Sequence, residues 1–175
     1  MERILIEGNM WSETRFNCVR YGNVIASRGS VVPLFLDQIA HGQPITVTSR
    51  EMTRFLLRLD GAVNVVFSAL QNAGRGEIFV PDVPAARIID LTEAMIDGRD
   101  IPIIVTGIRP GEKVHEIMIS DEESNYTTAR AGYYVIRPML PELLSEPLGE
   151  PALTSEYSAS KITLDRQGIK NLIQE

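Results

Sequence analysis

The segment Asp60–Val80, DGAVNVVFSALQNAGRGEIFV, predicts a helix that is followed almost directly by a buried strand. Asp60 is a good N-cap for the helix, and Gly74 is placed to stop it. The run Ile78–Val80 is short, apolar and follows a glycine-rich turn, as expected of a buried strand. The helix carries apolar side chains at helical spacing, namely Val63, Val66, Phe67 and Leu70.

The glycines of this segment do not form a dinucleotide-binding loop. Such a loop, G-x-G-x-x-G, follows a strand and opens a helix, whereas Gly74-Arg75-Gly76 follows a helix and precedes a strand. Strands separated by helices predict a mainly parallel or mixed sheet. The chain nevertheless offers too few strong strands for a complete doubly wound sheet. We therefore predict an α/β fold that contains only part of such a sheet.

Helix and strand signals alternate outward from this segment. Val32 to Ile39 has apolar residues at i, i+3, i+4 and i+7, with Pro33 in the first turn and Gly42 beyond the end. Ile88 to Met95 marks another helix, which ends before Gly98. Strands are expected at Arg15–Val24, Ile45–Thr48, Thr53–Leu59 (extended or at a sheet edge) and Ile101–Thr106.

The remaining elements are expected near the two ends of the chain. Glu2–Asn9 predicts the last turns of a helix, and Arg109-Pro110-Gly111 predicts a turn. One or two helical turns are expected after it, around Val114, Ile117 and Met118. Further along we expect a solvated acidic run at residues 121–123, a hairpin over Tyr126–Ile136 around Ala131-Gly132, an extended proline-rich tail, and a final helix capped by Asp165.

Composition places the chain among acidic globular proteins. Its 175 residues, with 44% hydrophobic and 23% charged, can bury a core. A formal charge of −6 and a pI near 5.0 argue against a nucleic-acid binder. One cysteine excludes an internal disulfide framework, and two scattered histidines do not make a metal site. No apolar run is long enough to span a membrane, and the N-terminus is too short and acidic for a signal peptide, so a cytoplasmic protein is expected.

Three motifs occur together in a characteristic order. They are R-Y-G-N-V at residues 20–24 with S-R-G-S-V-V-P at 27–33, E-M-T-R-F at 51–55, and G-I-R-P-G-E-K at 107–113. In this order and spacing the chain resembles extended short-chain dehydrogenase/reductases that act on nucleotide sugars. The resemblance is greatest to UDP-N-acetylglucosamine 4,6-dehydratases of capsule, O-antigen and flagellin-sugar biosynthesis. It runs from about Phe16 through the tail and matches only the C-terminal half of that family.

The resemblance implies that the redox chemistry lies outside this chain. Family enzymes begin with a glycine-rich cofactor loop and a catalytic Tyr-x-x-x-Lys helix, so both are expected upstream of Met1. No catalytic, cofactor-binding or metal-binding residue is therefore expected here. The intact family enzyme holds NADP or NAD tightly. It oxidises the C4 hydroxyl, which acidifies the C5 proton, then loses water from C6 and returns the hydride to C6.

A similar signature near the C-terminus is expected to be a coincidence. Tyr157-Ser158-Ala159-Ser160-Lys161 has the spacing of the catalytic Tyr-x-x-x-Lys. The chemistry needs this tyrosine on a helix that is followed by a strand and a substrate lobe. Only 14 residues follow Lys161, so that context is missing.

Two arginines are the strongest candidates for binding a nucleotide sugar. A diphosphate is bound by guanidinium groups and backbone amides. Arg54 lies where a strand-like segment meets a helix, and Arg109 lies in a turn directly after a strand. Each could also be an ordinary surface arginine, the commoner fate of any single Arg. With the family motif around both, we predict that they bind the diphosphate.

The resemblance assigns further residues to the substrate. It places Glu112 on the ribose hydroxyls and Asn23 near the phosphate or sugar, together with Ser30 and Pro33 of the second motif. It also implies that the backbone of Thr46 and Val47 pairs with uracil. Glu112 could instead be a solvated acid at a helix start, and Asn23 could satisfy loop backbone.

The predicted organisation follows from these assignments. Residues 1–120 should form a nucleotide-sugar-binding lobe with residual Rossmann elements, and residues 121–175 a hairpin, a proline-rich tail and a terminal helix. The expected function is that of the substrate-binding half of a UDP-N-acetylhexosamine 4,6-dehydratase, inactive alone. An epimerase fragment, a binding module without chemistry and a complementing subunit stay open. The expected partners are a UDP-sugar and either further copies of the chain or a polypeptide that carries the missing half.

Overall fold

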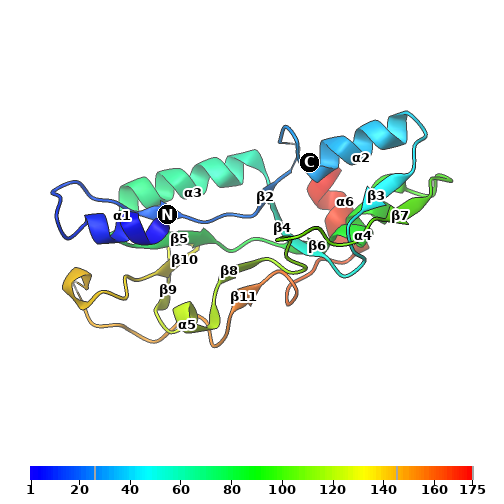
Figure 1. Ribbon diagram of the computed structural model, residues 1–175. Coiled ribbons are helices and arrows are strands. Elements are labelled where there is room, and N and C mark those ends of the chain that lie inside the picture. Colours follow the sequence, from blue (N-terminus) through cyan, green and yellow to red (C-terminus); the bar gives the residue numbers. More distant parts are fainter. Residues whose placement is uncertain (26, 145, 175) are drawn as a thin grey trace. The chain divides into compact units, whose positions relative to one another are not determined.

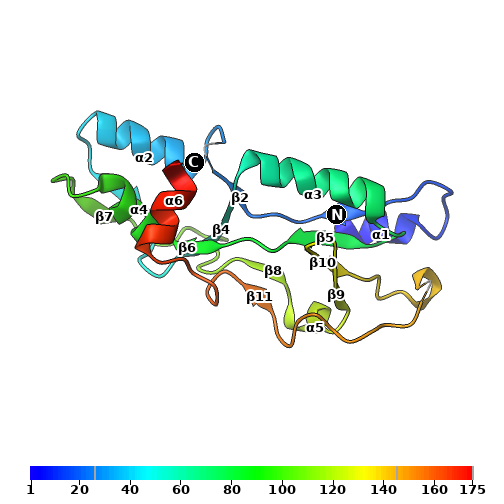
Figure 2. The ribbon, with the colours of Figure 1, turned by 180° about the vertical axis from the view of Figure 1, so that it is seen from behind.

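The computed structural model describes residues 1–25, 27–144 and 146–174, and its elements are shown from two sides in Figures 1 and 2. The described residues form two compact units, each assembled from separate segments of the chain. Unit 1 consists of Met1–Tyr21, Asp60–Asp82 and Ile117–Tyr157. Unit 2 consists of Gly22–Leu59, Val83–Glu116 and Ser158–Glu175.

Unit 1 is built on a mixed sheet in the order β1-β5-β10-β9. Helix α3 packs on this sheet through a core of Val65, Ala69, Ala73, Phe79 and Val135. The helix buries alanines and one valine because small residues let it approach the strands closely. The strands are β1 (Cys18–Val19), β5 (Ile78–Pro81), β9 (Thr127–Arg130) and β10 (Tyr133–Ile136), and α3 spans Leu59–Asn72.

The hairpin of unit 1 lies where the sequence predicts it. Strands β9 and β10 pair antiparallel, with Tyr133 opposite Arg130. Ala131 and Gly132 form the turn with φ of 53° and 82°, the sign that matches the twist of a two-residue hairpin. Strand β10 also pairs antiparallel with β5, whereas β1 pairs parallel with β5, so the sheet is mixed as expected.

An arginine ties the shorter elements of unit 1 together. Arg20 bonds Glu2 of α1 at 2.6 Å, Glu123 of α5 at 2.8 Å and the Met118 carbonyl at 2.7 Å. Ser120 and Glu123 also form a capping box at the start of α5. The elements joined by Arg20 are α1 (Glu2–Gly8), β8 (Ile117–Ile119) and α5 (Asp121–Ser124). Two further short elements are the 3₁₀ helix η1 (Pro141–Leu143) and the strand β11 (Tyr157–Ser158), and β11 pairs with β8.

Unit 2 contains two small sheets and the helices that cover them. In one sheet β4 lies between β2, which is parallel, and β6, which is antiparallel. In the other, β3 and β7 pair in parallel. The strands are β2 (Asn23–Val24), β3 (Ile45–Val47), β4 (Thr53–Leu57), β6 (Ala85–Arg87) and β7 (Ile103–Val105). The helices are α2 (Val31–Ala40), α4 (Ile88–Ile96) and α6 (Arg166–Gln174).

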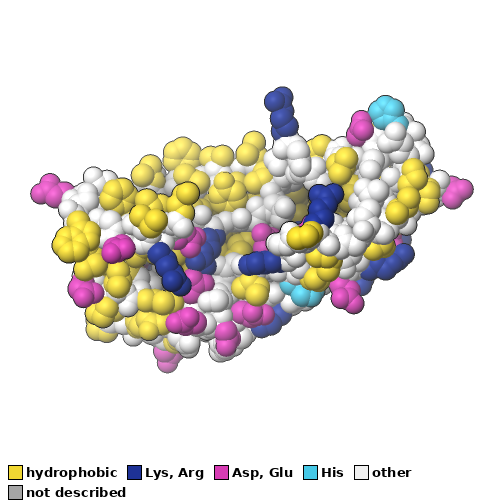
Figure 3. Space-filling model, viewed as in Figure 1, with side chains coloured by type: hydrophobic (Ala, Val, Ile, Leu, Met, Phe, Trp, Pro, Cys, Tyr) yellow, Lys and Arg dark blue, Asp and Glu magenta, His cyan; other side chains and the backbone are white. Residues whose placement is uncertain are grey.

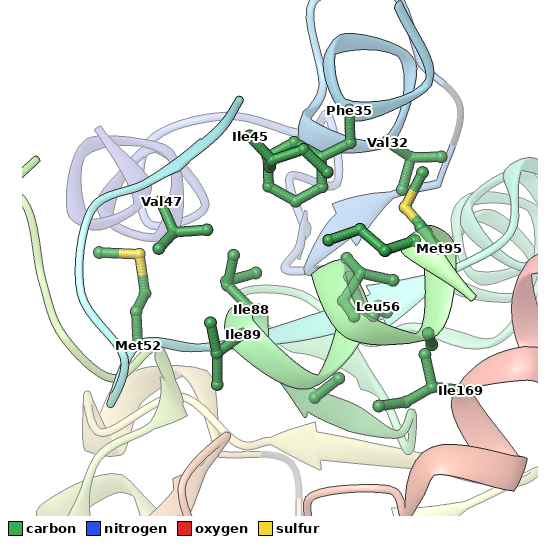
Figure 4. Close-up of a cluster of buried hydrophobic side chains, with 14 of the residues drawn as sticks. Val32, Phe35, Ile45, Val47, Met52, Leu56, Ile88, Ile89, Met95 and Ile169 are labelled. Carbon is green, nitrogen blue, oxygen red and sulfur yellow. The ribbon is translucent and has the colours of Figure 1, made fainter. Parts of the chain in front are cut away.

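The core of unit 2 joins residues that are far apart in sequence. Figure 4 shows Phe35 of α2, Ile45 of β3 and Met95 of α4 pointing into one cluster, which Ile169 of α6 completes. The apolar periodicity of α2 and α4 predicts these faces, and both helices are confirmed. The last helix is also confirmed, and Asp165 Oδ1 accepts the Gly168 N–H at 2.8 Å as an N-cap does.

The predicted strand Arg15–Val24 is wrong as a single element. Its first part, β1, pairs with β5 in unit 1, and its second part, β2, pairs with β4 in unit 2. Gly22 lies between them, packed directly against Phe55. Sequence pattern shows that both parts are extended, but it does not show which strand each part pairs with.

Other sequence predictions fail because tertiary pairing overrides the local pattern. Residues 53–59 are predicted as extended or at a sheet edge; the extended conformation is confirmed by β4, but β4 is the middle strand of its sheet and ends at Leu57. Asp60 lies inside α3 and does not cap it. Ile117 and Met118 belong to strand β8, not to a helix. The acidic run 121–123 is not fully solvated, because Glu123 is half-buried against Arg20.

Replacing Gly22 by alanine should destabilise the protein. A Cβ at this position would lie 2.7 Å from the Phe55 carbonyl oxygen, and backbone cannot move away as a flexible side chain can. We expect Gly22→Ala to lower the free energy of unfolding by about 1–3 kcal/mol, measured by urea denaturation. Gly149→Ala is the control, because its Cβ would meet nothing within 4 Å. Equal stability of the two variants would contradict this close packing.

The pair formed by Arg20 and Glu123 should make stability depend on pH. The hydrogen bond from Arg20 lowers the pKa of Glu123, so this contribution is present above the unfolded-state pKa of about 4.3. It is lost as the pH falls through the lower folded-state pKa. Between pH 6 and pH 3 the melting temperature should therefore fall less in Glu123→Gln than in the wild type. Glu122→Gln, at an exposed neighbour, should behave as the wild type does, and identical profiles for all three proteins would refute the assignment.

Candidate functional site

The sequence-predicted site residues all belong to unit 2. A subset of them gathers around the ends of β3 and β4 and the loop that follows β7. Asn23 lies on β2 opposite Leu56, and it therefore shares a sheet face with the side chain two residues earlier on β4, that of Arg54. Ser30 and Pro33 lie at the start of α2. The gathered subset consists of Thr46, Val47, Arg54, Arg109 and Glu112.

Strand β3 presents one paired and one open edge. The Ile45 N–H bonds the Pro102 carbonyl at 2.9 Å, and the Val47 carbonyl accepts the Thr106 N–H at 2.9 Å. Backbone groups alternate in direction along a strand, so the N–H and C=O of Thr46 point to the opposite edge. Within the described residues no strand covers that edge. A flat heterocycle could therefore bond there to the backbone.

The turn after β7 places Arg109 and Glu112. The Glu112 N–H donates to the Arg109 carbonyl at 3.0 Å, and Gly111 has a φ of 82°. Pro110 at the second position and glycine at the third are the residues that a type II turn requires, so the predicted turn is confirmed. The Glu112 carboxylate accepts the Arg109 N–H at 3.3 Å and faces the Thr48 hydroxyl at 3.5 Å. Arg109 itself is exposed.

Arg54 connects β4 to this loop. Its Nη1 donates to the carbonyls of Thr53 at 2.7 Å and Val114 at 3.1 Å, and its Nη2 donates to the Lys113 carbonyl at 2.8 Å. A guanidinium has five N–H donors, and the three bonds of Arg54 to carbonyls of the described residues use three of them. Arg54 therefore shapes the loop and still has donors for an anion.

Two further side chains hold the loop, and sequence reasoning missed both. His115 Nδ1 lies 2.9 Å from the buried Thr53 hydroxyl. Glu116 accepts the Phe55 N–H at 3.3 Å, and burial raises the pKa of its carboxyl, although this hydrogen bond and the charges of Arg54 and Lys113 oppose the shift. No local pattern marks these residues, because their partners lie about sixty positions away along the chain.

Charge is distributed unevenly between the two units. Unit 1 contains 13 of the 23 acidic and 6 of the 17 basic side chains, a formal charge of −7. Unit 2 contains the other 10 and 11, a formal charge of +1. The acidic character of the chain therefore resides outside the unit that contains the candidate site. An anionic ligand meets no net repulsion from unit 2 itself.

The other residues that the sequence analysis considered make local structural contacts. Tyr157 and Lys161 lie on a strand and the following turn instead of one helical turn apart, and the Tyr157 hydroxyl donates to Asp82 at 3.1 Å. His41 follows α2, and its Nδ1 lies 2.9 Å from the Asp37 carbonyl, as expected of a C-terminal cap. Among the described residues there is no cluster of ligand side chains for a metal ion, and no helix long and apolar enough to cross a membrane.

Comparison with known proteins identifies the family of the chain. The family model of polysaccharide biosynthesis proteins matches residues 1–138. The chain belongs to this family. Within it, the chain is 44% identical over 136 residues to the inverting UDP-N-acetylglucosamine 4,6-dehydratase of Campylobacter jejuni. It is 42% identical over 127 residues to the UDP-glucose 4-epimerase of Rickettsia canadensis.

The family members that match are longer than this chain. The matched region is 77% of this chain but 40% of the Campylobacter enzyme, and 71% of this chain but 37% of the Rickettsia enzyme. The solved structure of Pen from Bacillus thuringiensis superposes with a TM-score of 0.88 at 33% identity. It covers 99% of this chain and 55% of that protein. The predicted α/β, short-chain dehydrogenase type of fold is thus confirmed.

Removing the Arg54 side chain should loosen the loop even without a ligand. Arg54→Ala deletes three bonds to carbonyls, so the loop should open more often. We expect amide hydrogen exchange at Thr53 and Glu112 to accelerate about tenfold, which corresponds to about 1.4 kcal/mol of lost protection. Arg50→Ala, at an exposed position on the preceding turn, is the control and should leave exchange unchanged. Unaltered exchange in Arg54→Ala would show that the loop keeps its shape without this side chain.

Proposed function

We propose that unit 2 binds the nucleoside diphosphate part of a UDP-N-acetylhexosamine. On this proposal the chain is the substrate-binding part of a nucleotide-sugar 4,6-dehydratase of polysaccharide biosynthesis in the cytoplasm. The observation that carries it is the placement of Arg54, Arg109 and Glu112 around one ordered loop beside the open edge of β3. The names of the Campylobacter and Rickettsia relatives, both enzymes of UDP-sugars, support the ligand class.

Each part of the ligand has a chemically suitable group in this arrangement. The exposed Arg109 and the remaining donors of Arg54 bind the diphosphate oxygens through charge-assisted hydrogen bonds. Glu112 accepts hydrogen bonds from the ribose hydroxyls, and the Thr46 backbone pairs with the uracil edge. Asn23, Ser30 and Pro33 lie toward the hexose. Unit 2 has a formal charge of +1 and unit 1 a formal charge of −7, so electrostatics favours binding of this anion to unit 2.

The one glycine-rich segment with a G-x-G spacing does not suit a dinucleotide. The Gly74 N–H donates to the Glu77 carboxylate at 2.7 Å, and Glu77 also pairs with Arg130 at 2.7 Å. A protein carboxylate thus occupies the place where a loop amide would meet a phosphate. This segment is unsuited to NADP or NAD, and we assign no redox step to the residues of this chain.

A UDP-sugar 4-epimerase is the second candidate. The Rickettsia relative, at 42% identity over 71% of this chain, is the observation that favours it. Both reactions use a UDP-sugar, so the proposed binding residues serve either one. The dehydratase is preferred because its match is longer and more identical.

Loss of either arginine should weaken binding of UDP-N-acetylglucosamine. We expect Arg54→Ala and Arg109→Ala each to cost about 1.5–3 kcal/mol, measured by isothermal titration calorimetry. Arg109→Lys should recover part of the affinity, because a lysine keeps the charge but not the fork of donors. Arg109→Ala is the cleaner variant, since the described bonds of Arg54 also hold the loop.

The matched controls separate the diphosphate from the rest of the ligand. Arg50→Ala should bind as the wild type does. UMP, which lacks the second phosphate, should lose less affinity in Arg109→Ala than the UDP-sugar loses. Unchanged affinity in both alanine variants, or a wild-type chain that does not bind UDP, would contradict the proposal. Turnover of UDP-N-acetylglucosamine by the chain alone would show that its residues do more than bind.

A further inference from the structure

Glu116 carries a half-buried carboxyl group that has no ion-pair partner among the described residues. Most acidic residues of the chain are exposed, and Figure 3 shows several acidic side chains standing out from the face that it draws. Glu77 and Glu123 are also shielded from solvent, but they form ion pairs with Arg130 and Arg20. A carboxylate that leaves water is normally compensated in this way. The exception at Glu116 therefore needs an explanation.

The Glu116 carboxyl takes the place of a backbone carbonyl beside β4. Along one edge of this strand, the Thr53 N–H donates to the Val114 carbonyl at 3.0 Å, and β2 pairs further along. The Phe55 N–H lies two residues after that of Thr53, so it points to the same edge. It donates to Glu116 Oε2 at 3.3 Å. The carboxyl thus supplies the acceptor between the loop 113–116 and β2.

The charged state of Glu116 depends on cations of the candidate site. Burial raises the pKa of its carboxyl, whereas the Phe55 N–H and the positive charges of Arg54 and Lys113 lower it. Burial is the larger influence, so this carboxyl takes a proton more readily than an exposed glutamate does. Arg54 is also one of the two arginines proposed to bind the diphosphate. A change in the charge around Arg54 therefore acts on Glu116 as well.

The other elements around Glu116 carry two further titratable groups. His115 precedes it, and the His115 Nδ1 lies 2.9 Å from the Thr53 hydroxyl. The segment after β11 donates the Ala159 N–H to the Glu116 carbonyl at 2.9 Å and carries Lys161. Strand β2 contributes no charged side chain. Of the described residues, the two cations named above are the ones whose charges act on the carboxyl.

A bound diphosphate would change this balance. On the proposed function its oxygens take the remaining donors of Arg54, and its negative charges offset the positive charge that acts on Glu116. A half-buried carboxylate beside a like charge is disfavoured, and the neutral acid becomes the more stable form. The neutral acid still has a carbonyl oxygen that can accept the Phe55 N–H. Protonation therefore relieves the repulsion and leaves the hydrogen bond to β4 in place.

We propose that binding of the diphosphate is coupled to the uptake of a proton by Glu116. The proton comes from the solvent and returns to it when the nucleotide leaves. Because such coupling is reciprocal, the chain binds the nucleotide more tightly as the pH falls. The inference rests on the proposed function, since it needs a diphosphate beside Arg54. It adds a pH response to that site and a role for a residue that contacts β4.

Calorimetry in buffers of different ionisation enthalpy tests the coupling, because the heat of the buffer reports the protons exchanged on binding. The probe is UDP-N-acetylglucosamine, whose diphosphate is esterified at both ends and does not titrate between about pH 5 and pH 7. If the ligand raises the proton affinity of Glu116 about tenfold, about 0.5 proton should be taken up at the midpoint. The affinity for the ligand should rise by the same factor, about tenfold, across the whole titration.

Two variants assign the proton. Glu116→Gln keeps an oxygen that accepts the Phe55 N–H but cannot take up a proton, so it should bind without this uptake and with a flatter pH profile. Hydrogen exchange at the Phe55 amide should be the same as in the wild type, which checks that the strand edge is intact. Glu93→Gln, at an exposed position on α4, is the matched control and should take up the same number of protons as the wild type.

A second measurement needs no variant. The ¹³C resonance of the Glu116 carboxyl in the wild type should titrate at a higher pH when UDP-N-acetylglucosamine is bound. A resonance whose titration the ligand leaves unchanged would overturn the coupling, as would proton uptake that persists in Glu116→Gln. Binding by the wild type without proton uptake would overturn the coupling and leave the proposed function standing. Absence of UDP-sugar binding would overturn both.

Discussion

Strand β4 (Thr53–Leu57) is hydrogen-bonded to a neighbouring strand along each edge, and its first residues also bond to the loop 113–116. The geometry of the candidate site depends on these contacts. Strand β2 pairs with one edge and β6 with the other, so the register of β4 is fixed. The Thr53 hydroxyl, the Arg54 guanidinium and the Phe55 N–H then each bond to a different group of the loop 113–116. A shift of β4 by one residue would turn Arg54 into the core and release the loop. The geometry of the loop therefore depends on the register of β4 in its sheet.

The three charged residues at this loop, Arg54, Glu112 and Arg109, differ in how far their side chains are already hydrogen-bonded within the protein. Arg54 keeps its charge and donates three hydrogen bonds to backbone carbonyls, and the Glu112 carboxylate accepts the backbone N–H of Arg109 in its own turn. Arg109 is at the turn's first position, where the type II geometry fixes its backbone and leaves its side chain exposed to solvent. This arrangement suits a ligand that carries both phosphate oxygens and hydroxyls. It also places the anion-binding groups in the unit whose net charge is not negative.

Unit 1 differs from unit 2 in how its charged and large apolar side chains are used. Three of its carboxylates, those of Glu2, Glu123 and Glu77, form ion pairs with Arg20 or Arg130. The two pairs of Arg20 join α1 to α5. Its helix α3 buries small residues and leaves the large ones outside. The large apolar residues of a domain are normally its core. Helix α3 departs from this rule, because Phe67 and Leu70 are more than half exposed.

Short-range features could be predicted from residue order, whereas long-range pairing could not. The turn at Arg109–Glu112 follows from proline and glycine at adjacent positions, and the hairpin at Ala131-Gly132 and helix α2 follow from equally local signals. The family, and through it the candidate arginines, could be recognised from motifs of five to seven residues. The carbonyl partners of Arg54, the role of Glu116 and the splitting of residues 15–24 between two sheets required the folded chain. Each of these joins residues that are tens of positions apart, and sequence spacing does not specify sheet partners at that range. The same reason explains α3, whose apolar residues are apparent from its sequence, while which side is buried depends on the strands it packs against.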